Sequence, residues 1–476
     1  MNGDLRVLVV AILASFVAFL DGSVVNLALP AIARDLHSGL ALQQWVVDGY
    51  LLTLGALILV AGSISDMFGR LAVLRLGLSA FGVGCLLAAG APTGAVLVIA
   101  RLIQGVGAAI LIPSSLALIN STFRERALPR AIGIWTAWTG TAFVLGPLLG
   151  GLAVDLLNWR WIFILSAIPV VATFVLSVGL GLPREPRPRG ARIDVAGAVL
   201  AAAGLAGTVF ALIELQRLGL AHVAVALAIG LASSVAFVWW QFRAAHPMLP
   251  MHLFAVRNFG AGNLSTLFVY AGVSIGTLIV SLFLQEVVGF SATEAGIATL
   301  PLPVLSFLLA TRVGTLAARF GPHWFMAAGP LIAAAGFVAM RPDAARCDFW
   351  LQLLPGLVLF GVGLTVTVTP LTSAVLAAVD PSQSGIGSAV NNAVARIAGL
   401  ITVALAGVIT GGALDYGSFR RVADVTAALF AVGAAVAAVG IRNPARPAKP
   451  IADDAMAQCS DRPAVPPGRY VARSTG

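Results

Sequence analysis

The fold is decided by the run VLVVAILASFVAFLDGSVVNLALP (residues 7–30), in which Asp21 is the only charged residue. At a rise of about 1.5 Å per residue, a helix of this length crosses the ~30 Å hydrocarbon layer of a membrane. Apolar segments of similar length follow along the chain. Their predicted ranges are 42–63, 71–91, 94–119, 130–155, 160–182, 193–215, 220–240, 259–285, 292–315, 322–341, 349–373, 385–412 and 422–442.

Composition agrees with a membrane protein. Charged residues make up 10% of the chain, against about 25% in an ordinary soluble domain, and the mean hydropathy is +0.97. The runs are continuously apolar and rich in Gly and Ala, whereas strands of a membrane barrel would alternate, so the spans are predicted to be helices. The first run exceeds signal-peptide length and contains Asp21, so we expect it to be retained. The predicted fold is therefore an all-α integral membrane protein with fourteen transmembrane helices.

The distribution of Lys and Arg predicts the orientation. With a cytoplasmic N-terminus, 20 of the 29 basic residues fall on the inner side and 7 on the outer side, while Arg101 and Arg396 lie within spans. The positive-inside rule then places both termini in the cytoplasm, and we expect the protein in the plasma membrane. Anchoring to the bilayer accounts for the net charge of +9 without nucleic acid as a partner.

Several mechanisms find no support in the sequence. The only lysine is Lys449 in the tail, so a phosphate-binding loop for ATP is missing. The five histidines are scattered without metal-ligand spacing, so we expect no metal, no cofactor and no membrane-embedded enzyme. The three cysteines cannot form a framework of paired disulfides. A sensor or scaffold would normally carry a soluble output domain, and the loops are too short to hold one.

Two stretches suggest an internal duplication. Residues 62–70 read GSISDMFGR and residues 314–322 read GTLAARFGP, so each has a glycine followed by Phe-Gly six and seven residues later. Both stretches lie at predicted cytoplasmic ends of even-numbered spans, although a generic glycine-rich turn would explain either alone. A duplicated transporter architecture is predicted. The expected parts are a six-helix bundle at 1–182, two linking helices at 183–258, a six-helix bundle at 259–442 and a disordered cytoplasmic tail at 443–476.

Several motifs resemble those of the fourteen-helix drug:proton antiporters of the major facilitator superfamily. The first-span stretch LDGSVVNLALP (residues 20–30) resembles the family's signature there, with Gly22 and Ser23 as departures, and residues 66–70 resemble the superfamily's loop motif. Further matches are Arg101, Gln104, Gly105 and Gly107 on the fourth span, Gly140, Gly146, Pro147, Gly150 and Gly151 on the fifth, and Asn391, Arg396 and Gly399 on the thirteenth. The resemblance covers all spans. It implies two six-helix bundles of major facilitator type plus two extra central helices, and it leaves the substrate undefined.

Four polar residues are predicted to couple transport to protons. Asp21, Asp48 and Arg101 share a depth of roughly 8–14 Å below the predicted outer membrane surface. Charges facing lipid are costly, so these side chains should turn inward, with Gln104 one helical turn from Arg101. A structural ion pair between Asp21 and Arg101 is the alternative, and Asp48 could instead lie in outer water.

A gating role is predicted for two groups. Gly146 and Gly150 permit close helix approach around Pro147, which removes one backbone hydrogen bond, so this segment can act as a hinge; ordinary close packing explains the spacing as well. Asp66, with Gly69 and Arg70, is predicted to latch the cytoplasmic side by meeting the positive end of the thirteenth helix. Capping of its own turn is the alternative for Asp66.

The predicted substrate pathway draws on aromatic and polar residues of several spans. These residues are Asn26, Trp135, Trp138, Asn391 and Arg396. Any single aromatic is more often a packing residue, and Arg396 could instead bond to carbonyls of its own bundle.

The sequence thus predicts a proton-coupled antiporter that exports hydrophobic small molecules, such as drugs or antibiotics, by alternating access. Its partners would be the substrate, protons and the lipid bilayer, and we expect a monomer. An exporter of a lipid or endogenous metabolite, or a major facilitator importer, is the alternative.

Overall fold

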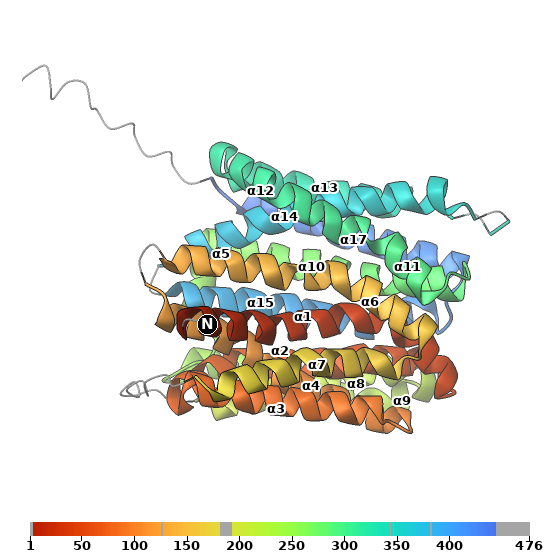
Figure 1. Cartoon of the computed structure of the whole chain (residues 1–476). Coiled ribbons are helices and arrows are strands. Elements are labelled where there is room, and N and C mark those ends of the chain that lie inside the picture. Colours follow the sequence, from red (N-terminus) through yellow and green to blue (C-terminus); the bar gives the residue numbers. More distant parts are fainter. Residues whose placement is uncertain are drawn as a thin grey trace, which may run out of the picture. The chain divides into compact units, whose positions relative to one another are not determined.

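The computed structural model describes residues 3–124, 127–180, 193–342, 344–345, 347–380 and 383–443, except the side chains of Asp66, Pro129 and Ser384. The tail from residue 444, predicted to be disordered, lies outside the described residues. The helices (Figure 1) are α1 Gly3–Asp35, α2 Leu40–Phe68, α3 Arg70–Ala89, α4 Gly94–Thr122, α5 Ala127–Gly140, α6 Ala142–Leu156, α7 Arg160–Val178, α8 Val195–Leu218, α9 Leu220–Arg243, η1 Met251–Ala255, α10 Arg257–Glu286, α11 Ala292–Thr299, α12 Pro301–Phe320, α13 Pro322–Ala339, η2 Phe349–Leu353, α14 Leu354–Ala377, α15 Ser384–Ala404, α16 Ala406–Thr410 and α17 Tyr416–Gly440.

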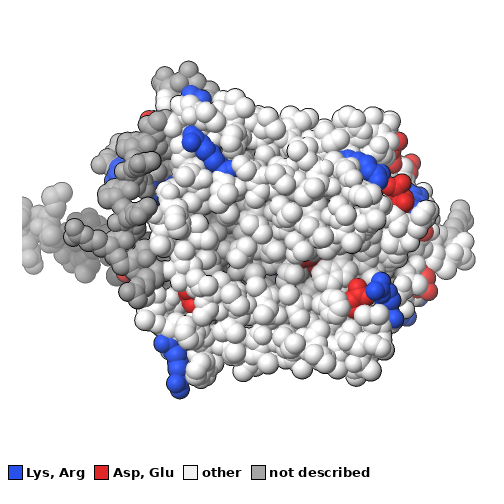
Figure 2. Space-filling model, turned by 90° about the horizontal axis from the view of Figure 1, so that it is seen from below, with Lys and Arg blue, Asp and Glu red and all other residues white. Residues whose placement is uncertain are grey.

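The prediction of fourteen spans is confirmed. Within the described residues, fourteen helical segments are long and apolar enough to cross a membrane. Space-filling atoms in Figure 2 show the same pattern on one face of the molecule, because charged residues gather toward its two ends and uncharged surface lies between them. Such a belt is what a hydrocarbon layer requires.

Two faces are defined by the ends of the helices. The helices run roughly side by side (Figure 1). The terminal face is the end where α1 and α10 begin and α17 stops. The far face carries the turns at residues 36–39, 287–291 and 411–415. Alternation of the spans between these two ends follows from the short turns that join consecutive helices.

Two groups of helices pack within the described chain. In the N half (residues 3–180), α4 contacts α1, α2 and α3, and α7 contacts α1 and α3. In the C half (residues 257–443), α13 contacts α14 and α17, and α10 contacts α15 and α17. Between the halves, α2 packs against α15, α6 against α11 and α1 against α10. One apolar cluster includes buried residues of both halves, such as Phe163 and Phe283.

The linking pair α8–α9 is central in the chain but peripheral in space. The two helices pack on each other, and α8 also contacts α2 and α15. Only 11% of the most apolar window of α9 is buried, against 61% in α1. An apolar helix with little protein around it must cover its surface with lipid, so α9 lies at the edge of the bundle.

Three spans that the sequence presents as continuous are broken helices. Span 130–155 consists of α5 and α6, span 292–315 of α11 and α12, and span 385–412 of α15 and α16. Pro301 begins α12 because its missing N–H is harmless at the first position of a helix. The first two broken spans meet each other, since α6 packs on α11.

Both Phe-Gly stretches form the same kind of turn. Gly69 has φ of 95° between α2 and α3, and Gly321 has φ of 89° between α12 and α13. Side chains rarely adopt such positive φ, so glycine is required at both positions. Gly219 turns similarly between α8 and α9, with φ of 78°, so this geometry by itself does not establish the duplication.

Candidate functional site

A buried network joins three of the four residues predicted to couple protons. Nη1 of Arg101 donates to Oδ2 of Asp21 over 2.5 Å and to Oε1 of Gln104 over 2.8 Å. The Gln104 amide in turn donates to Oδ1 of Asp21 over 3.2 Å. Relative exposure is 1% for Asp21, 1% for Arg101 and 0% for Gln104. The ion pair between Asp21 and Arg101, which the sequence offered as the alternative to proton coupling, is therefore present and buried. The coupling role of these residues stays a prediction.

Helix α2 completes the surroundings of the guanidinium. Nε of Arg101 donates to the carbonyl oxygen of Val46 over 2.8 Å, and Cζ lies 4.6 Å from the ring centroid of Tyr50. The Tyr50 hydroxyl donates to the carbonyl oxygen of Ala18 over 3.0 Å. Arg101 is thus held by an acid, an amide, a carbonyl and an aromatic face. An ammonium group could not satisfy that set, because it lacks the planar fork of donors.

Small residues allow α2 and α4 to approach this closely. A Cβ atom on Gly105 would lie 2.3 Å from the carbonyl oxygen of Tyr50 and 2.1 Å from Oγ1 of Thr53. Gly49 lies against the Cβ atom of Arg101. The motif glycine Gly105 therefore has a packing role, since any side chain on it would push the helices apart.

Cys85 is a member of the network that sequence reasoning missed. The Gln104 amide donates to its Sγ atom over 3.2 Å, and Cys85 is fully buried on α3. A cysteine in an apolar span carries no signal in the sequence, because buried free cysteine is common as a small apolar residue.

The alternative location of Asp48 in outer water is wrong. Its exposure is 0%, and neither carboxylate oxygen has a hydrogen-bond partner in the part of the chain that the structure describes. Gln44, one turn earlier on α2, donates to carbonyl oxygens of α15, and Trp45 donates to Glu214 of α8. Asp48 follows these residues by four and three positions, so it lies on the side of α2 that faces α15 and α8. Depth alone predicted that Asp48 would share a site with Asp21 and Arg101. In the structure, Asp48 lies on a different side of α2 from Val46 and Tyr50, which contact Arg101.

Asp155 joins the two halves at the far face. Its Oδ1 accepts the Ala292 N–H over 3.1 Å and its Oδ2 accepts the Thr293 N–H over 2.7 Å. These donors belong to the first turn of α11, where free N–H groups and the helix dipole attract an anion. Gln43 of α2 donates to Glu286 of α10 over 2.7 Å at the same end. Sequence reasoning missed Asp155, because its partners are backbone groups far along the chain.

The predicted hinge glycines lie at close helix contacts. A Cβ atom on Gly146 would come within 2.9 Å of the Ser23 Cβ atom of α1, and one on Gly150 within 3.3 Å of Val24. In the C half, a Cβ atom on Gly296 of α11 would lie 2.4 Å from the Pro147 carbonyl oxygen. The Pro147 segment therefore sits where α6 touches both α1 and the C half. Its conformational role stays a prediction.

The predicted terminal-face latch is only partly visible. The Asp66 side chain lies outside the described residues. Gly69 separates α2 from α3 through its positive φ, and Arg70 is the first residue of α3. The position of this loop at the terminal face agrees with the prediction, while the contact with α15 stays a prediction.

The predicted pathway residues have different surroundings. The Trp135 ring N–H donates to Ser15 over 3.2 Å, whereas Trp138 is 60% exposed. The Asn391 amide donates to Asn263 and Thr266 of α10, so its donor group is occupied within the C half. Asn26 is half-buried.

Arg396 differs from Arg101 in having no hydrogen-bond or ion-pair partner among the described residues. It is half-buried on α15, and no hydrogen bond or ion pair from it reaches the part of the chain that the structure describes. The alternative that it bonds to carbonyls of its own half is therefore not what the described residues show. Its Cβ atom packs 3.9 Å from where a Cβ atom on Gly55 of α2 would stand.

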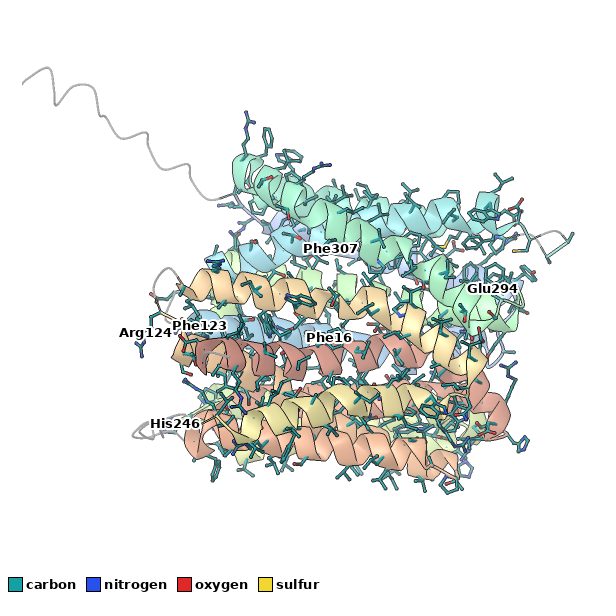
Figure 3. The ribbon with its side chains drawn as sticks, viewed as in Figure 1. Phe16, Phe123, Arg124, His246, Glu294 and Phe307 are labelled. Carbon is teal, nitrogen blue, oxygen red and sulfur yellow. The ribbon has the colours of Figure 1, made fainter. Side chains whose placement is uncertain are left out.

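A pocket of about 1160 Å³ opens between the halves at the far face. Its wall includes Arg34, Gln43, Asp155, Glu286 and Glu294. Figure 3 shows Glu294 at this end, Arg124 at the opposite end, and Phe16 and Phe307 near mid-length. Asp155 lines this pocket, so the pocket lies directly beside the contact that this residue makes between the halves.

Comparison with known proteins identifies the family of this chain. The model of the Major Facilitator Superfamily matches residues 11–260. The puromycin resistance protein pur8 of Streptomyces alboniger is 35% identical, covering 85% of this chain and 82% of the relative. The methylenomycin A resistance protein of Bacillus subtilis (strain 168) is 33% identical, covering 85% and 87%. The inward-open xylose transporter XylE of E. coli matches with a TM-score of 0.65 at 14% identity, over 93% of this chain and 97% of that one. With fourteen spans, this chain belongs to the Major Facilitator Superfamily, in its fourteen-helix drug:proton antiporter family.

Proposed function

We propose that this chain is a proton-coupled antiporter that exports hydrophobic small molecules, drugs or antibiotics among them, across the cytoplasmic membrane by alternating access. The observation that carries the proposal is the buried network of Asp21, Arg101 and Gln104. It stands in a transporter whose relatives are named for resistance to puromycin and methylenomycin. The terminal face is taken as cytoplasmic, in line with the positive-inside rule.

Asp21 is the proposed proton carrier. In the present state its charge is balanced by Arg101 and by the Gln104 amide. Protonation would remove the ion pair and leave the Arg101 cation uncompensated in an apolar core, which is costly. The protein would then favour a different helix arrangement, and this links the proton to a conformational change.

The contacts between the halves support a state closed toward the far face. Asp155, Gln43 and Pro147 all contribute there. In the proposed cycle, substrate binds from the cytoplasm or inner leaflet while Asp21 is ionised. A proton arriving from outside then favours release and resetting. Inward movement of one proton provides about 1.4 kcal/mol per pH unit and about 2.3 kcal/mol per 100 mV, enough for a concentrative exporter.

Everted membrane vesicles test both coupling and direction. Wild-type vesicles with an acidic interior should accumulate drugs from a panel that includes puromycin, and collapse of the pH gradient should abolish accumulation. Asp21→Asn should insert normally and exchange drug at equal pH, yet fail to accumulate it. Asp35→Asn is the matched control, because Asp35 is on the same helix but at the far-face surface, paired with Arg160. Gradient-driven accumulation by Asp21→Asn at the wild-type level would contradict the assignment.

A further inference from the structure

Arg101 and Arg396, the two arginines that the sequence placed within spans, are in opposite electrostatic situations. Arg101 is fully buried and neutralised by Asp21. Arg396 is half-buried near the middle of the span Gly385–Thr410, and among the described residues it has no carboxylate or carbonyl partner. A cation at membrane depth is costly unless it meets water or an anion. At Arg396 the C half therefore presents a positive charge that the described residues leave uncompensated.

The surface of α15 shows where this charge points. Asn391 and Thr402 bond to α10, and Arg396 packs against Gly55 of α2. Successive residues of a helix turn by about 100°, so Asn392 falls between the α10 side and the α2 side. Asn392 is exposed although it lies within a span. Because α10 belongs to the C half and α2 to the N half, this open sector with Asn392 and Arg396 faces the space between the halves.

Polar aromatic groups from both halves lie within the electrostatic range of Arg396. Tyr50 of α2 and Tyr270 of α10 lie near enough to Arg396 for an electrostatic interaction with its guanidinium. Tyr50 also contacts Arg101, so the open sector is close to the buried network. Along α2, Gly55 is five residues from Tyr50, roughly 7–8 Å toward the terminal face. A ligand group held at Arg396 would thus lie on the terminal-face side of the coupling residues.

Asp48 does not neutralise Arg396 in this state. Both residues lie at the contact between α2 and α15, but Asp48 is seven residues from Gly55, roughly 10 Å nearer the far face. Its carboxylate is buried without a hydrogen-bond partner, and the two side chains form no ion pair. The described residues therefore supply no counter-charge for Arg396 in this state.

We propose that Arg396 binds an acidic group of the transported molecule, so that amphipathic carboxylic acids are a substrate class of this transporter. This rests on the proposed function and narrows it. A guanidinium recognises a carboxylate through two parallel hydrogen bonds, and the second amide hydrogen of Asn392 remains available beside it, since the first bonds to Ser388 within the helix. The aromatic side chains between the halves would contact the apolar body of the molecule.

Binding of three probes with one aromatic body tests the charge preference. The probes are pyrenebutyric acid, its methyl ester and pyrenebutylamine, measured by fluorescence anisotropy with the full chain in nanodiscs. Loss of a hydrogen bond to a charged group typically weakens binding by roughly 10- to 150-fold, so wild type should favour the acid over the ester by at least about tenfold. Arg396→Gln should abolish this preference, while Arg396→Lys should retain part of it.

Controls separate the possible sources of the anion and the causes of failure. Arg243→Gln removes a cation that lies on the Trp239 ring of peripheral helix α9 and should leave the preference unchanged. Nanodiscs with and without phosphatidylglycerol should bind the acid equally. Competition by that lipid would identify a lipid headgroup as the occupant and overturn the substrate assignment.

The substrate assignment would also be overturned if the acid bound wild type no more tightly than its ester. It would equally be overturned by a preference that survives in Arg396→Gln. Because binding is measured without transport, these results are independent of the proton-driven accumulation that tests the proposed function.

Discussion

Asp155 offers a direct test of how the far face is held closed. In Asp155→Asn, one oxygen can still accept an N–H of α11, but the negative charge at the start of that helix is lost. A charge at a helix terminus is typically worth about 0.3–1 kcal/mol when exposed. This range for exposed charges applies because Asp155 is exposed and solvent screens its charge. Only the state closed at the far face contains this contact, so the ratio of far-face-open to far-face-closed protein should rise roughly two- to fivefold.

The assay is labelling of a buried reporter from the far side. Ala298→Cys places a small thiol on α11 where exposure is 6%, in a background without Cys347 and Cys459. An impermeant maleimide should label it two- to fivefold faster when Asp155→Asn is added, by the ratio given above. Glu294→Gln is the matched control, because Glu294 caps its own helix at Ser291 and does not bridge the halves. Unchanged labelling in Asp155→Asn, or an equal rise in Glu294→Gln, would refute the reasoning.

Three further predictions address packing and charge. Arg101→Lys should insert normally but lose most drug efflux in a cell-based assay, because an ammonium cannot contact Asp21, Gln104 and the Val46 carbonyl together; wild-type efflux would reduce Arg101 to a simple positive charge. Gly105→Ala should lower the free energy of unfolding by about 1–3 kcal/mol, because the added methyl group overpacks the contact. Gly133→Ala should not, since a Cβ atom there would have nothing within 4 Å. Equal melting temperatures of the two variants would count against the close α2–α4 contact. Burial acts to raise the pKa of Asp194, but hydrogen bonds from Gln241, Trp240 and the N–H groups of Gly197 and Met248 outweigh it and hold the pKa below its ordinary value. The contribution of ionised Asp194 to the free energy of unfolding should therefore be fully present above a pH of about 3.9 and be lost as the pH falls through the lowered pKa. Asp194→Asn should lack this contribution. A dependence of melting temperature on pH that is identical in wild type and variant would contradict this.

The span pattern and the core of the site were predictable from local sequence. A run of apolar residues long enough for the membrane must become a helix, because lipid offers no partner for backbone groups. Asp21, Arg101 and Gln104 could be grouped because charges within spans must turn inward and Gln104 follows Arg101 by one turn. The breaks at Thr141 and Leu300 were not predicted, since hydropathy does not report where a helix bends.

The environment of each buried charge was decided by tertiary structure alone. Asp48 shares the depth of Asp21, yet the rotation of α2 turns it toward α15. Asp155 looked like an ordinary residue at the end of a span until α11 placed two N–H groups on it. Arg396 is without a described partner because of how α15 sits between α2 and α10. Length and apolarity are properties of one segment and can be read from it, whereas partners depend on the relative rotation and position of helices that are far apart in the chain.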